Sequence, residues 1–60
     1  MITIKNACYY ATQCAYIVYR MVDGEAWFFS AWDDLVKADS QAREFGLCVA
    51  DIAHCDLQIW

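Results

Sequence analysis

The chain has 60 residues, enough for one domain, and a domain of this size buries only about 60% of its unfolded surface. Eight acidic residues against four scattered basic ones give a net charge of −4, so direct binding of nucleic acid is not expected. Apolar residues make up 62% of the chain, and three Trp, four Tyr and three Phe are too many rings for so small an interior. We therefore expect an aromatic surface that meets another molecule.

The N-terminal segment begins with residues 2–5, ITIK, whose alternating apolar and polar side chains indicate a short strand. Residues 6–13, NACYYATQ, fit a loop, a strand extension or a turn of helix equally well. The apolar run is interrupted by Thr12 and Gln13 and has no convincing signal-peptide cleavage region. We therefore expect no membrane span, a cytoplasmic location and reduced thiols.

A β-hairpin is predicted at residues 15–22 and 25–29, where β-branched and aromatic residues flank Asp23-Gly24, a preferred pair for a type I′ turn. The two-residue turn implies a register running from Val22 opposite Glu25 to Val18 opposite Phe29. Both faces of this hairpin are then largely apolar, and a single helix cannot cover both of them. One face holds Ile17, Tyr19, Met21, Ala26 and Phe28, and the other holds Tyr16, Val18, Arg20, Trp27 and Phe29.

A helix is predicted over residues 31–45, because its apolar residues recur at spacings of three and four. Ser30 followed by Asp33 resembles a capping box, and Gly46 is placed to end the helix. We expect this helix to leave the Trp27 face of the hairpin uncovered. The apolar stripe consists of Ala31, Leu35, Ala38, Ala42 and Phe45.

The C-terminal segment contains residues 47–52, which suit a strand or a short helical turn, and residues 57–60, which alternate as a strand does. The chain as a whole therefore predicts an α+β fold in a single domain. A small antiparallel sheet, made of the hairpin, the strand at 57–60 and a possible strand at 2–5, packs on one helix.

The cysteines and the single histidine are the candidates for metal binding or catalysis. The cysteine pairs are separated by five and six residues, unlike the close pairs of zinc sites, so buried reduced thiols are the first expectation. A disulfide or a zinc site that includes His54 is the alternative. Neither a metal nor a cofactor is expected, and no residue is predicted to be catalytic, so an enzyme is not expected. The cysteines are Cys8, Cys14, Cys48 and Cys55.

The second hairpin face is the predicted partner-binding site. Its aromatic residues would anchor a partner protein, Arg20 would lie across the Trp27 ring, and a rim of carboxylates would orient the complex. Two alternatives remain: the face packs against a second copy in a homodimer, or residues 6–13 fold over it. The predicted site residues are Tyr16, Arg20, Trp27, Phe29, Asp33 and Asp34.

The hairpin around Asp23-Gly24 and the helix from Ala31 to Phe45 give the chain a size and architecture that resemble a class of small inhibitors. Phages and mobile elements make these proteins, which include anti-CRISPR proteins, against bacterial defence complexes. The resemblance implies a non-catalytic inhibitor that occupies a surface of a larger complex, often a basic surface that would otherwise grip nucleic acid.

Overall fold

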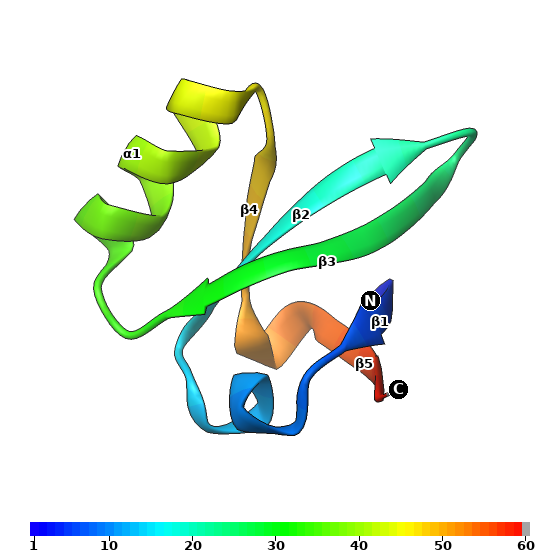
Figure 1. The fold of residues 1–60 in the computed structure, drawn as a ribbon. Helices are drawn as coiled ribbons and strands as arrows, with labels where there is room; N and C mark the ends of the chain where they lie inside the picture. The colour runs from blue at the N-terminus through cyan, green and yellow to red at the C-terminus, as the bar shows by residue number, and fades with distance from the viewer. Residues whose placement is uncertain (60) are drawn as a thin grey trace.

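The computed structural model describes residues 1–59 as a five-stranded sheet with one α-helix (Figure 1). In this part of the chain no helix combines the length and apolar character needed to cross a membrane. The elements, in chain order, are β1 (Ile2–Ala7), the 3₁₀ turn η1 (Tyr9–Gln13), β2 (Tyr16–Val22), β3 (Glu25–Trp32), α1 (Leu35–Phe45), β4 (Cys48–Asp51), the 3₁₀ turn η2 (Ile52–His54) and β5 (Cys55–Ile59).

The strand order in the sheet is β4-β2-β3-β1-β5. The predicted α+β class is confirmed, as are the hairpin, the N-terminal strand and a C-terminal strand, although Trp60 lies outside the described residues. The sheet is mixed rather than antiparallel, because β1 runs parallel to both β3 and β5. The connection through η1 places β1 beside β3 instead of beside its neighbour in sequence, β2.

The hairpin turn is of the predicted type, since Asp23 and Gly24 both have positive φ angles, of 51° and 80°. The predicted register is confirmed from the turn as far as Tyr19 opposite Phe28. Beyond that point it is wrong: Val18 lies opposite Ser30 instead of Phe29. A β-bulge inserts one extra residue into β3 here and shifts every later pair.

The bulge turns Ser30 and Trp32 toward the helix. The indole Nε1 of Trp32 donates to Ser30 Oγ at 3.0 Å and to Gln41 Oε1, on α1, at 3.1 Å, and Ser30 Oγ also donates to Gln41. Because side chains alternate along a strand, Ser30 and Trp32 would face away from α1 without the extra residue. The bulge thus gives a half-buried indole N–H its hydrogen-bond acceptors.

Helix α1 begins at Leu35, four residues later than predicted, because residues 30–32 pair with β2 as strand. The predicted capping box at Ser30 is wrong. Asp34 is the N-cap instead, and its carboxylate accepts from the backbone N–H of Val36 at 2.9 Å. The C-terminal end is as predicted, with Gly46 in the left-handed conformation at φ 67°.

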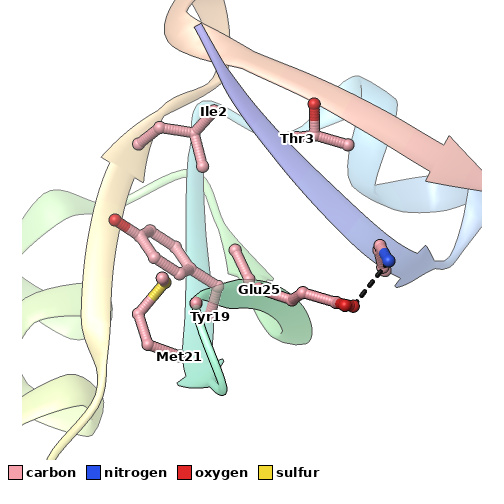
Figure 2. A pocket seen from close by; sticks show the side chains of 8 residues that line it. Ile2, Thr3, Tyr19, Met21 and Glu25 are labelled. Carbon is pink, nitrogen blue, oxygen red and sulfur yellow. Dashed lines mark hydrogen bonds and ion pairs between the residues drawn. The ribbon is translucent and has the colours of Figure 1, made fainter.

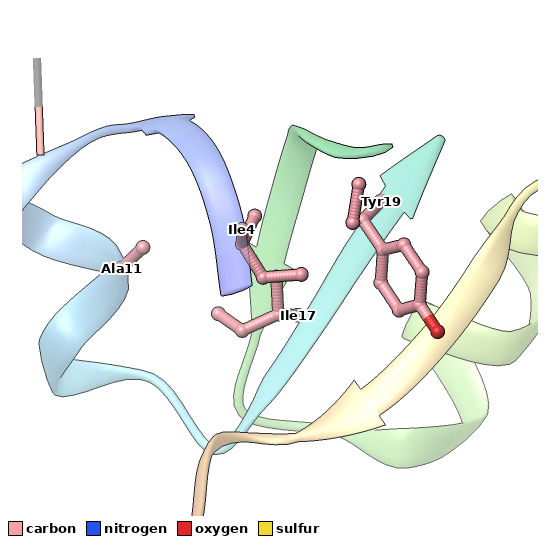
Figure 3. Close-up of a cluster of buried hydrophobic side chains, with 5 residues drawn as sticks. Ile4, Ala11, Ile17 and Tyr19 are labelled. Carbon is pink, nitrogen blue, oxygen red and sulfur yellow. The ribbon is translucent and has the colours of Figure 1, made fainter. Parts of the chain in front are cut away.

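The sheet curls because its two edge strands are close in sequence. β4 and β5 lie at opposite edges, yet only the three residues of η2 connect them, so their linked ends must come together. The concave face of the curl holds a core that includes Ile4, Ile17 and Tyr19 (Figure 3). Ala11, in η1, is fully buried against this core, so the segment 6–13 covers the concave face.

The opposite, convex face carries α1. Ala38 and Ala42 are buried against Val18, and their small side chains let the helix lie close to β2. The expectation that the helix would leave the face of Tyr16 and Val18 open is therefore wrong, because both residues belong to the cluster under α1. The partly buried members of this cluster are Tyr16, Trp32, Leu47 and Val49.

Candidate functional site

Three aromatic side chains lie together on the convex face where α1 does not fully cover it. Trp27 and Phe29 on β3 are each 40% exposed, and Phe45 at the end of α1 is 50% exposed. The rings of Phe29 and Phe45 are tilted at 41° with their centroids 5.4 Å apart. Trp27 and Phe29 are two residues apart on one strand, which places them about 7 Å from each other. We call Trp27, Phe29 and Phe45 the aromatic patch.

Trp27 stands between two basic residues on the neighbouring strands. Lys5 on β1 and Arg20 on β2 each lie opposite Trp27 in the sheet, so the three residues form a row across three strands. The Lys5 ammonium lies 5.8 Å from the centroid of the Trp27 ring and 2.5 Å from the Glu25 carboxylate. The predicted pairing of Arg20 with Trp27 is confirmed, but the cation over the ring is Lys5, because β1 lies beside β3.

The other predicted site residues lie elsewhere. Tyr16 is half-buried in the cluster under α1. Asp33 accepts a hydrogen bond from the backbone N–H of Ala15 at 3.2 Å, and Asp34 caps α1. Both carboxylates are at the start of this 11-residue helix, about 16 Å from its other end, where Phe45 joins the patch. The structure therefore brings together Arg20, Trp27 and Phe29 but not the remaining three.

Sequence reasoning missed two residues of this surface, Phe45 and Lys5. Phe45 was assigned to the buried stripe of the helix, yet only Ala38 and Ala42 of that stripe are buried within α1. The small size of these two alanines could have indicated this arrangement. It lets the middle of the helix pack closely on the sheet, while the larger residues at the helix ends lie at the border of the contact and stay partly exposed. Lys5 could not be found, because its place beside Trp27 depends on the parallel pairing of β1 with β3.

A second feature is a hollow of about 370 Å³ at the open mouth of the curled sheet. Figure 2 shows Ile2 from β1 and Tyr19 and Met21 from β2 around it, with the Lys5–Glu25 ion pair at its rim. Burial, with a smaller contribution from Cys48 and Cys55, raises the pKa of the Tyr19 hydroxyl. The phenol therefore stays protonated at neutral pH and cannot act there as a base.

The four cysteines are free thiols. Burial raises the pKa of Cys14, with help from Asp33, and that of Cys55, with help from Asp51, so neither is an activated thiolate. Cys8 and Cys48 are exposed, so the expectation of buried thiols is wrong for them. Across residues 1–59, no three His, Cys, Asp or Glu side chains come together as a metal-binding group, and the zinc alternative gains no support.

Comparison with known proteins finds no matching family model, curated protein or solved structure. We therefore infer the function from the geometry of the surface. Trp27, Phe29 and Arg20 are exposed on one face of the sheet and are of the types that are enriched at protein interfaces.

Proposed function

We propose that this protein is a small non-catalytic binding module that inhibits a larger protein complex by covering part of its surface. The aromatic patch carries the proposal: Trp27, Phe29 and Phe45 leave between 40% and 50% of their surface exposed on one face of a 60-residue chain. Trp, Tyr and Arg are the residues most often responsible for binding energy at protein interfaces. Trp27 and its register partner Arg20 supply two of these three residue types.

The position of Trp27 supports this role. It lies on β3, which is paired on both sides, with β2 and with β1, so the backbone beneath the indole is held in place. A side chain on a fixed backbone loses less conformational entropy when a partner binds. The ion pair between Lys5 and Glu25 also restricts the conformations of the Lys5 side chain, which lies over the Trp27 ring.

A comparative pull-down from bacterial lysate tests the proposal. The wild-type protein, Trp27→Ser and Tyr9→Ser would be immobilised, and captured proteins identified by mass spectrometry. Tyr9 is the matched control, because it is an exposed aromatic residue on η1, which covers the opposite face of the sheet. We expect one complex to be captured by the wild type and by Tyr9→Ser and lost with Trp27→Ser. Equal capture by all three folded proteins would refute a role for the patch.

Light scattering separates this proposal from the homodimer alternative. A partner-binding module should have the mass of one chain, and Trp27→Ser should not change it. A mass of two chains that falls to one chain in Trp27→Ser would show that the patch is a self-interface instead.

A further inference from the structure

Arg20 is an exposed guanidinium without a carboxylate partner in the described part of the chain. The ion pairs among residues 1–59 are Lys5 with Glu25 and Arg43 with Asp39. Arg20 takes part in neither, although the chain has eight acidic residues and only four basic ones. Its register partner is Trp27, so the uncompensated positive charge lies at the edge of the aromatic patch.

Resting on the proposed function, we propose that the patch recognises an extended partner segment in which an Asp or Glu side chain lies two residues before or after an apolar one. The carboxylate would bind Arg20, whose planar guanidinium can donate two parallel hydrogen bonds to it. The apolar side chain would lie on Trp27 and Phe29. The partner would therefore carry a negative charge at this site. The chain's own carboxylates Asp33 and Asp34 accept hydrogen bonds from the backbone near the start of α1.

The spacing of the surface suits an extended peptide. Arg20 pairs with Trp27, and Phe29 lies two residues further along β3, a step of about 7 Å on a regular strand. Side chains two residues apart on an extended chain point the same way and are separated by a similar distance, about 7 Å. A carboxylate and an apolar side chain at such positions can contact Arg20 and the patch together.

A nucleic acid fits this surface less well, although an aromatic ring between two basic residues could stack on a base. Nucleic acid carries a charge at every phosphate and needs several basic residues along its path. Here Lys5 is already paired with Glu25, which leaves Arg20 as the uncompensated charge of the row. The net charge of −4 would also repel a polyanion, while a single carboxylate needs only one guanidinium.

Selection from a displayed library of random linear peptides tests the inference. The library would be selected on wild-type protein, on Arg20→Ser and on Lys37→Ser, with Trp27→Ser used to remove peptides that bind elsewhere. Lys37→Ser is the matched control, because Lys37 is an exposed cation on α1 and its loss changes the net charge equally. A single-stranded oligonucleotide would be titrated in parallel, with the tryptophan fluorescence of the wild type and of Trp27→Ser compared as the readout.

We expect peptides with Asp or Glu two residues from an apolar residue to be enriched on the wild type and on Lys37→Ser. Their affinity should fall about two- to fivefold on Arg20→Ser, as expected for an exposed charged pair. Trp27-dependent peptides without acidic enrichment, or with equal affinity for Arg20→Ser, would overturn the inference and leave the binding function intact. Arg20-dependent binding of the oligonucleotide in place of peptides would overturn it in favour of nucleic acid. A selection with no Trp27-dependent peptide and no oligonucleotide binding would count against both proposals.

Discussion

The substitution Ala42→Leu tests the contact between α1 and the sheet. Ala42 is 4% exposed and packs with Ala38 against Val18, so a leucine adds three carbon atoms where no space is left. Overpacking of this kind costs about 1–3 kcal/mol of unfolding free energy. A domain of this length has only about 3–9 kcal/mol in total, so the loss is a large fraction of its stability.

Chemical and thermal unfolding followed by circular dichroism would measure this loss. Each kcal/mol lowers the midpoint temperature of a domain this small by about 4–8 °C, so we expect a fall of about 4–24 °C. The control is Arg43→Leu, because the Arg43 side chain is 81% exposed and arginine and leucine have similar helix propensities. Its exposed ion pair with Asp39 contributes little. If Ala42→Leu were as stable as Arg43→Leu, α1 would not pack on the sheet through Ala42.

Two further predictions concern the helix cap and alkaline pH. Asp34→Ala should lower the free energy of unfolding, measured in urea titrations, by about 1 kcal/mol, while Asp34→Asn should keep most of the capping contribution. Equal losses in the two variants would rule out capping by this side chain. The free energy of unfolding should be constant up to about pH 8.5 and then fall. The pKa values of the Cys55 thiol and the Tyr19 hydroxyl are raised in the folded protein, so the unfolded chain loses these protons at a lower pH and is favoured as the pH rises. Urea midpoints measured in reducing buffer from neutral to alkaline pH would check this, and a flat profile would contradict it.

Part of the proposed interaction surface could be predicted from the sequence. Arg20 and Trp27 share a face and a register position because the two-residue turn determines the pairing of the residues next to it. Phe29 was placed on the same face, and its exposure agrees with that placement. Tyr16 was placed there too, but it lies further from the turn, where the cluster under α1 partly buries it.

The locally encoded features of the fold each depend on a few neighbouring residues. Asp23-Gly24 makes the type I′ turn because both residues adopt positive φ angles at little cost, and Gly46 ends the helix for the same reason. The alternation of apolar and polar side chains likewise predicted the first strand, and the spacing of the alanines predicted the buried side of α1.

Long-range packing selects the conformation where distant residues compete for the same segment. Residues 30–32 could extend a strand or start a helix. Pairing with β2 and the hydrogen bond from Trp32 to Gln41 stabilise the strand, so the helix begins later and Asp34 becomes its N-cap. The bulge in β3 presents this indole to a helix that follows in the chain. Lys5 reaches Trp27 only because β1 pairs with β3, a long-range contact that no local pattern encodes.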